Sequence, residues 1–257
     1  MKYWHETIAV AQRILTELWR RRRSLIFWCV FPLFLLLLNG YILSEQGNIP
    51  LDQGMALAAP SSLVGAALFF SCLGGSVATI VGEREQKTLK RLLISPLSGT
   101  AYFLGIFFAH SMIAIGQTIL VYTCAAFFGA NFEGSIWLGL LIIFLSIIAY
   151  VGAGFMLGTQ LARRTEDVNT LIATFGVPLL ILGGAFLPAS LFTDNLLEVA
   201  QFNPIYHMTE ALTSVWARGD NLSAIAPHFW FLFGFAITMF FFSWLAYQSM
   251  LIVERKR

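Results

Sequence analysis

The 257-residue chain has few charged residues, and its long apolar segments have none near their centres. Only 12% of the residues are Asp, Glu, Lys or Arg, whereas 58% are hydrophobic. Globular domains contain about a quarter charged residues, so this composition predicts an integral membrane protein. Transport coupled to protons or ions usually needs an ionisable group at mid-membrane depth. The lack of Asp, Glu, Lys and Arg at that depth argues against a pump driven from within the chain.

Motifs for catalysis and for metal binding are also missing. Cys29, Cys72 and Cys124 lie in apolar segments at unrelated spacings, which favours neither a disulfide framework nor a metal site. There is no HExxH, no GxSxG and no GxxxxGK[ST] phosphate loop, since Lys87-Thr88 follow Gln86 and not a glycine. We therefore expect no catalytic residue, metal ligand or cofactor site in this chain, and no nucleic-acid partner.

Six apolar segments are long enough to cross a bilayer. A helix rises about 1.5 Å per residue, so roughly 20 residues cover the ~30 Å hydrocarbon core. We expect an all-α fold with one transmembrane domain over residues 1–257, embedded in the lipid bilayer. The predicted spans are residues 24–44, 58–82, 101–128, 136–161, 168–188 and 228–253.

Two further segments are amphipathic. In residues 1–23, apolar side chains recur at helical spacing and a basic run ends the segment, which predicts an interfacial helix and not a cleaved signal peptide. Residues 188–227 are too polar to span, yet they carry apolar residues throughout. We predict two short re-entrant helices in the outer leaflet, broken at Asn203-Pro204.

The charges are divided unevenly between the two sides of this topology. Fifteen of the 16 basic residues fall on the side of the termini, leaving only Arg218 on the other. The 14 acidic residues divide seven and seven, so the sides carry 15 − 7 = +8 and 1 − 7 = −6. The positive-inside rule then predicts that both termini lie in the cytoplasm.

Residues 83–97 form a short charged helix between the second and third spans. Leu89, Leu92 and Leu93 share one helical face, and Pro96 stops the helix. Lys and Arg at the bilayer centre cost about 2.5–3.5 kcal/mol each, so this helix must lie at the membrane surface. It is either a connector resting on headgroups or a contact for a cytoplasmic partner.

This helix resembles the E-x-x-T-L-x-x-L-x-x-x-P signature of the ABC-2 type permeases, with Gln86 at a place where the family often has Gly. In that family the helix is the coupling helix that docks on an ATPase subunit. The matching residues are Glu85, Thr88, Leu89, Leu92 and Pro96, and Glu83 and Leu93 belong to the same expected docking helix.

The resemblance covers nearly the whole chain, and it implies the six-span fold of this family (the type V exporter fold). It implies two copies of an ATPase subunit that bind ATP and Mg, a second permease protomer in a homodimer, and the bacterial inner membrane. The short outer loops look like those of its drug, lipid and nodulation-factor exporters. The alternative is a membrane scaffold or biogenesis subunit that recruits a cytoplasmic partner without transport.

Several residues are candidates for the pathway or for helix packing. His110 and Gln117 lie seven residues apart on one face, and we favour hydrogen bonding between helices over contact with substrate or protons. By resemblance, the first, second and fifth spans line the pathway, and the cargo is a lipid, a lipid-linked glycan or a hydrophobic drug. The other candidates are Phe31, Phe34, Gly65, Gly75, Phe175 and Pro178.

Overall fold

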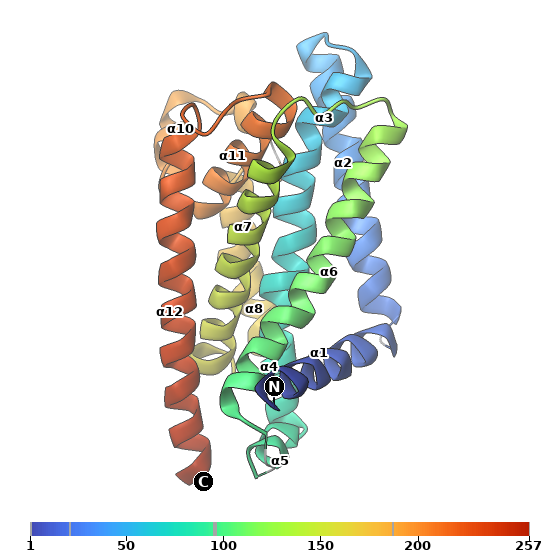
Figure 1. The fold of residues 1–257 in the computed structure, drawn as a ribbon. Helices are drawn as coiled ribbons and strands as arrows, with labels where there is room; N and C mark the ends of the chain where they lie inside the picture. Colours follow the sequence, from blue (N-terminus) through green and yellow to red (C-terminus); the bar gives the residue numbers. More distant parts are fainter. Residues whose placement is uncertain (1, 21, 95–96, 187, 257) are drawn as a thin grey trace.

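The computed structural model describes residues 2–20, 22–94, 97–186 and 188–256, and every regular element in these ranges is a helix. Long helices run side by side, while α1 (Lys2–Arg20) lies across them near one end (Figure 1). The predicted all-α membrane fold with six candidate spans is confirmed. The stretches that are long and apolar enough to cross a membrane are Arg22–Gly47, Leu51–Glu85, Gly99–Phe127, Ile136–Leu161, Thr165–Leu182 and Ala226–Ile252.

Three of these spans combine α-helix with wider π-helical turns. Among all six spans, the second span is the most buried and the fifth span is the least buried. The elements, in chain order, are α2 (Arg22–Gly47); α3 (Leu51–Ser61), η1 (Ser62–Gly74) and α4 (Gly75–Glu85); α5 (Thr88–Ile94); α6 (Gly99–Phe127); α7 (Ile136–Met156) and η2 (Leu157–Leu161); α8 (Thr165–Leu171), η3 (Ile172–Gly176) and α9 (Val177–Leu182); and α12 (Ala226–Lys256).

Two span boundaries differ from the prediction by more than three residues. The second span begins at Leu51 and not at residue 58, because Asp52 stands in the first turn of α3, where the helix dipole favours a carboxylate. The fifth span ends at Leu182 and not at residue 188, because the chain leaves the helix at Gly183 and Gly184 has a φ of 77°.

Pro178 does not break the fifth span. It stands in the first turn of α9, directly after the π-helical turns of η3. A proline within a helix leaves a carbonyl one turn earlier without its amide partner. A π-helical turn changes the hydrogen-bond register at this point, so the helix continues.

Residues 188–227 contain η4 (Ala189–Leu191), α10 (Asp194–Ala200) and α11 (Pro204–Arg218). The predicted break at Asn203-Pro204 is confirmed, because the Asn203 side chain accepts a hydrogen bond from the Ile205 amide (3.0 Å) and caps α11.

The apolar face of α11 is packed inside the protein. It lies against α3, α7 and α12, and Met208, Leu212 and Val215 have no exposed surface. α10, in contrast, exposes Leu196 and Val199. Insertion of α10 into the outer leaflet stays a prediction, whereas the apolar residues of α11 are accounted for by contacts within the bundle.

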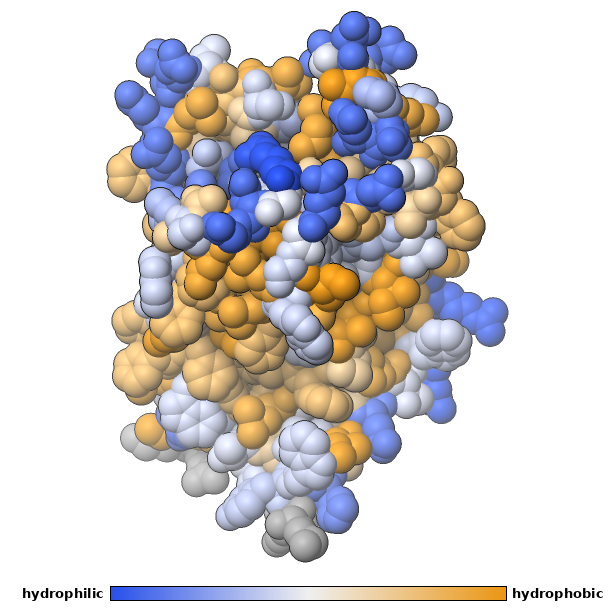
Figure 2. Space-filling model, turned by 45° about the horizontal axis from the view of Figure 1, so that its top comes forward, coloured by the Kyte–Doolittle hydropathy of each residue, from blue (hydrophilic) through white to orange (hydrophobic). Residues whose placement is uncertain are grey.

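Both ends of the chain lie at the end of the bundle that holds α5, which we call the basic end (Figure 1). The opposite end, where α3 begins and α10 lies, is called the acidic end. Figure 2 shows hydrophilic side chains gathered over the acidic end and a band of hydrophobic side chains below them. This arrangement fits a bundle whose middle lies in lipid and whose ends meet water and headgroups.

Small residues allow the central helices to approach closely. A Cβ at Gly65 would lie 2.0 Å from the Ala185 Cβ, and one at Gly75 would lie 2.7 Å from the His110 Cε1. On α7, a Cβ at Gly154 would lie 2.0 Å from the Ser76 Oγ. The close approach of neighbouring helices at Gly65, Gly75 and the Gly154–Gly158 pair therefore depends on the lack of a side chain.

We expect Gly154→Ala to destabilise the protein by about 1–3 kcal/mol, because the added methyl group overlaps Ser76 and the Leu73 carbonyl. Gly116→Ala on α6 is the matched control, since no atom lies within 4 Å of its new Cβ. Thermal unfolding of the purified protein in detergent measures both. Equal midpoints for the two variants would contradict the tight contact between α7 and the second span.

Candidate functional site

The charged helix predicted between the second and third spans is present as α5. It follows α4 after a two-residue turn in which the Lys87 amide donates to the Arg84 carbonyl (3.0 Å). Lys87 has a φ of 58°, a left-handed conformation that favours glycine, whereas Gln86 has an ordinary φ of −78°. The position that needs the freedom of glycine is therefore Lys87 and not Gln86.

Two of the three apolar side chains on the apolar face of α5, those of Leu89 and Leu92, pack against the protein itself. Leu89 is 2% exposed and belongs to the main hydrophobic core, and Leu92 packs against that core. Thr88 is half-buried. Leu89 is thus buried within the protein. The sequence had instead suggested that Leu89 is presented to a partner. The Leu93 side chain and Pro96, two further predicted docking positions, lie outside the described residues.

The exposed surface near α5 is polar and mostly charged. Glu85, Gln86, Lys87 and Arg91 are all exposed at the basic end. The charges of Glu85, Lys87 and Arg91 are of both signs. Their role in docking stays a prediction.

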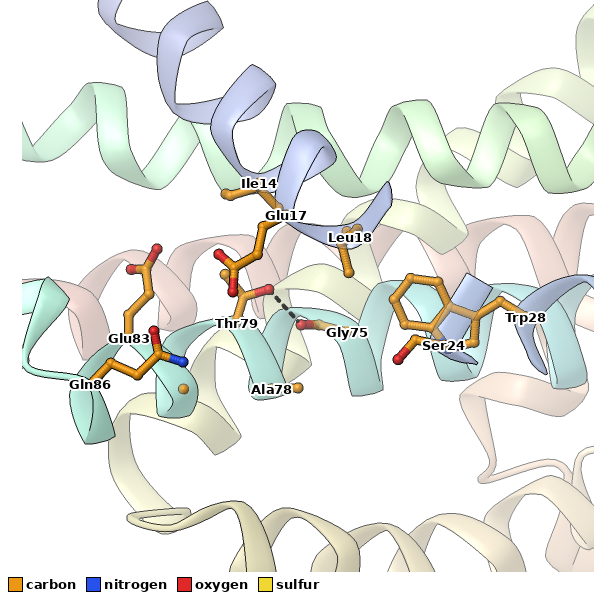
Figure 3. Close-up of a pocket in the computed structure, with 11 residues that line it drawn as sticks. Ile14, Glu17, Leu18, Ser24, Trp28, Gly75, Ala78, Thr79, Glu83 and Gln86 are labelled. Carbon is orange, nitrogen blue, oxygen red and sulfur yellow. Dashed lines mark hydrogen bonds between the residues drawn. The ribbon is translucent and has the colours of Figure 1, made fainter. Parts of the chain in front are cut away.

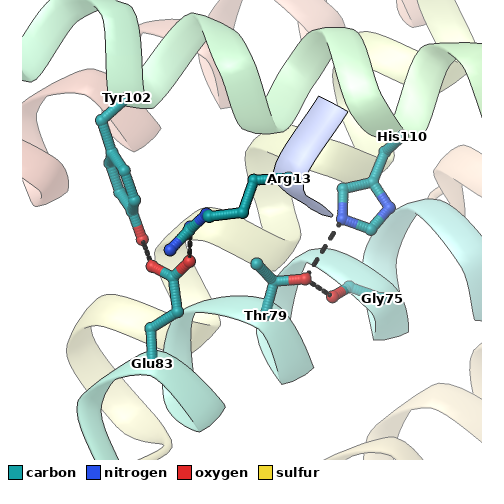
Figure 4. A network of polar contacts seen from close by, with 6 residues as sticks. All are labelled: Arg13, Gly75, Thr79, Glu83, Tyr102 and His110. Carbon is teal, nitrogen blue, oxygen red and sulfur yellow. Dashed lines mark hydrogen bonds and ion pairs between the residues drawn. The ribbon is translucent and has the colours of Figure 1, made fainter. Parts of the chain in front are cut away.

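Glu83, predicted as a docking residue, is instead buried in a polar network that joins three helices. Its carboxylate forms an ion pair with Arg13 of α1 and accepts a hydrogen bond from the Tyr102 hydroxyl of α6 (Figure 4). Only 6% of Glu83 is exposed. A buried carboxylate is tolerated when it is paired and hydrogen-bonded in this way, so Glu83 holds α1 and α6 against α4.

Neighbouring polar groups fasten the same end of the second span to the fourth and fifth spans. The Arg84 guanidinium donates to the carbonyl of Ala162 (2.9 Å). The Glu85 carboxylate accepts hydrogen bonds from the Thr165 amide (3.0 Å) and the Thr165 hydroxyl (2.7 Å). Three consecutive residues, 83 to 85, therefore connect the base of α5 to different neighbours.

Helix α1 contributes a second contact with the start of α6. The Glu6 carboxylate accepts a hydrogen bond from the Ser98 amide (3.0 Å), and the Ser98 hydroxyl caps α6 by accepting from the Ala101 amide (3.0 Å). Helix α1 is thus bound at both its Glu6 and its Arg13 side chains. Nothing in the sequence indicated that Arg13 meets Glu83.

A small cavity of about 80 Å³ lies beside this network, between α1, the start of α2 and α4 (Figure 3). Thr79, on its wall, donates its hydroxyl to the Gly75 carbonyl (2.9 Å), and Trp28 closes one side. Ligand pockets usually exceed about 300 Å³, so this space suits ordered water and not a substrate.

Gln117 links three helices through hydrogen bonds, the role that the sequence analysis favoured for it. Its amide donates to the Trp28 carbonyl of α2 (2.9 Å) and accepts from the Ser71 hydroxyl of η1 (2.6 Å). His110 is fully buried on the same face of α6, with its Nε2 3.5 Å from the Thr79 hydroxyl (Figure 4). Both side chains lie in contacts between helices.

The predicted pathway aromatics are not brought together. Phe31 joins an aromatic cluster in which it stacks on Phe27 (5.1 Å between centroids) and meets Phe186 edge-on (6.2 Å). Phe34 is 57% exposed on α2. Phe175, from the fifth span, borders a separate apolar cavity of about 370 Å³ formed with α7, α11 and α12.

Comparison with known proteins identifies the family to which this arrangement belongs. Residues 5–217 match the family described as ABC-2 type transporter. The chain belongs to this family. The coupling-helix signature at Glu85, Thr88, Leu89, Leu92 and Pro96 therefore lies in a genuine ABC-2 chain, and the resemblance noted in the sequence is confirmed.

The relatives found are membrane permeases. The chain is 24% identical over 152 residues to the "Inner membrane transport permease YhhJ" of Escherichia coli K12, covering 58% of this chain and 40% of the relative. It is 24% identical over 153 residues to the "Probable multidrug ABC transporter permease YbhR" of the same organism, covering 59% and 41%. This ABC-2 chain thus spans about two fifths of the length of these curated relatives.

Proposed function

We propose that this ABC-2 chain is the membrane-spanning permease of an ATP-binding-cassette exporter, powered by ATP hydrolysis in a separate ATPase subunit. The observation that carries the proposal is the position of α5. It continues the most buried span beyond the bundle, with its apolar face anchored in the core and charged residues exposed around it. The family match supports the same assignment.

The contacts at the base of α5 suit the transmission of motion. Only two residues separate α4 from α5, so a displacement of α5 acts on the second span without an intervening flexible loop. Glu83, Arg84 and Glu85 pass the displacement to α1, α6, the end of the fourth span and the start of the fifth. The network thereby supports a concerted movement of several spans.

The charge bias supports a cytoplasmic location for the basic end, and we propose that two ATPase subunits carrying ATP and Mg bind there. A second copy of this chain completes a homodimer. The fifth span supports this, because it is the least buried of the six and exposes Phe175 and Leu179. The bacterial inner membrane is the proposed location, in line with the name of the relative YhhJ.

The cargo proposed is a lipid, a lipid-linked glycan or a hydrophobic drug-like molecule. The apolar cavity beside Phe175 has about 370 Å³ of space, within the range of small-molecule pockets. The name of the relative YbhR includes multidrug transport, which is consistent with such a cargo.

Removal of the phosphate-loop lysine from the partner ATPase is expected to stop export, whatever the proton gradient. No Asp, Glu, Lys or Arg stands at mid-span to carry ions. His110→Gln is expected to keep most of the transport, because Gln also hydrogen-bonds between helices. Export by proteoliposomes, with and without an uncoupler, measures both effects.

Two results of that experiment would change the assignment. Export that persists without ATP hydrolysis, but collapses with an uncoupler or with His110→Gln, would make His110 the functional centre. ATPase recruitment without any export or substrate-stimulated hydrolysis would favour the alternative, a membrane scaffold or biogenesis subunit.

A further inference from the structure

A cavity of about 320 Å³ lies at the acidic end, among α2, α3, the segment after the fifth span, α10 and α11. Its volume falls within the range of small-ligand pockets. Leu43, near the end of the first span, and Leu57, near the start of the second, both line it. The cavity therefore lies at the level where spans end and lipid headgroups begin.

One wall carries two opposite charges. Arg218, the only basic residue that the sequence assigns to this side, pairs with Glu210 at 3.5 Å. Charge-assisted hydrogen bonds between such groups are usually about 2.7–2.9 Å long, so this pair is loose. The Glu210 side chain is 18% exposed and that of Arg218 is 49% exposed. Each charge therefore retains capacity for a further partner, and the wall is neutral overall.

Hydroxyl groups stand beside this pair. Thr209 is 4% exposed, lines the cavity, and its hydroxyl has no hydrogen-bond partner among the described residues. A threonine in a helix has two accessible χ1 rotamers, so this hydroxyl can turn into the cavity. Ser61 donates to the Ala58 carbonyl, which leaves its oxygen able to accept. A polar molecule in the cavity would satisfy the Thr209 hydroxyl.

The remaining wall is largely apolar, and it includes Leu43, Leu57, Pro188 and Leu197. A site with an apolar wall on one side and a pair of opposite charges on the other fits a molecule with an apolar part and a polar part. The polar part of such a molecule has one negative and one positive group. A purely anionic lipid would offer no cationic group to Glu210, and a neutral sugar would offer an ionic group to neither of the two charges.

We propose that this cavity binds a zwitterionic phospholipid with a primary ammonium group, of the phosphatidylethanolamine class. The phosphate contacts Arg218, the ammonium contacts Glu210, and Thr209 hydrogen-bonds to the headgroup. The glycerol and the first acyl carbons lie against the leucine side chains. The site holds the lipid whether or not lipid is the exported cargo, so it stands apart from the ATP-driven function.

Lipid binding to the purified full-length protein in detergent tests the proposal, with native mass spectrometry as the readout. We expect phosphatidylethanolamine to bind at least about 10-fold more tightly than phosphatidylcholine or phosphatidylglycerol. Only the primary ammonium donates a charge-assisted hydrogen bond to Glu210, and such a bond is worth about a factor of ten or more. Soluble glycerophosphoethanolamine should bind more weakly than the lipid, because it lacks the acyl carbons.

Two variants and a control make the test specific. Glu210→Gln should remove the preference for the primary ammonium. Thr209→Val, which keeps the side-chain shape, should weaken phosphatidylethanolamine binding about 2- to 10-fold, the worth of one neutral hydrogen bond. Without lipid, it should leave thermal unfolding unchanged or raise its midpoint. Asp194→Asn, at an exposed acid on α10 away from the cavity wall, should change neither quantity.

Three outcomes would overturn the proposal. The first is equal binding of all three lipids. The second is an unchanged headgroup preference in Glu210→Gln while that variant remains folded. The third is glycerophosphoethanolamine binding as tightly as the lipid, which would assign the cavity to a soluble ligand. None of these results depends on the ATPase, so they leave the proposed export function untouched.

Discussion

Glu83→Ala is expected to destabilise the protein by about 2–4 kcal/mol, because it leaves the Arg13 guanidinium and the Tyr102 hydroxyl without their shared partner. The cost stays below that of a fully buried pair, since a third of the Arg13 side chain (33%) is exposed. Thermal unfolding in detergent gives the change. Glu166→Ala, at an exposed acid on α8, should have little effect.

A double-mutant cycle separates the ion pair from the fold around it. If Glu83 and Arg13 act as a pair, Arg13→Ala combined with Glu83→Ala should cost clearly less than the sum of the two single changes. Additive effects would show that the two side chains stabilise the protein independently. An unfolding midpoint for Glu83→Ala equal to that of the unaltered protein would contradict the buried network itself.

Leu89→Asp is expected to cost more than about 3 kcal/mol, because it removes a core side chain and buries an unpaired carboxylate. Loss of ATPase recruitment in this variant would therefore follow from loss of α5 structure. Arg91→Glu, at an exposed position on the same helix, should keep the unfolding midpoint and weaken recruitment in a salt-dependent manner. Co-purification with the ATPase and thermal unfolding together distinguish the two effects.

Asp194→Lys serves as the control for charge reversal, since it changes an exposed charge at the acidic end. It should leave recruitment intact. A Leu89→Asp protein that unfolds like the unaltered protein, yet fails to bind the ATPase, would restore Leu89 as a direct docking residue. If the Arg91→Glu variant recruits the ATPase as strongly as the unaltered protein at every salt concentration, the charged surface of α5 is not part of the interface.

The differences between sequence and structure concentrate in short amphipathic segments. The stripe of Leu89 and Leu92 correctly indicated that one face of α5 is covered, but the pattern is the same for a partner protein and for the chain's own core. The same ambiguity applied to α11, whose apolar residues were assigned to lipid and in fact pack against α3, α7 and α12. In both cases periodicity identified the face, and only the packing identified its neighbour.

Polar contacts between distant segments were the other missed feature. Arg13 and Glu83 are 70 residues apart in the sequence. The local sequence around each of them looks the same as the sequence around a solvent-exposed charged residue. Gln117 was easier to interpret, because a polar side chain within an apolar span has few partners other than a neighbouring helix.

The sequence by itself determined the number of candidate spans, their approximate limits, the side on which basic residues gather and the position of the charged helix α5. These features follow from local properties: the length of apolar runs, the count of charges between them, and a short motif. The tertiary structure alone decided that Leu89 and Glu83 are buried, that α1 is held to α4 and α6, and that a neutral, partly polar cavity forms at the acidic end. Each of these depends on contacts between residues far apart in the chain, which the relative placement of the helices creates and no local pattern specifies.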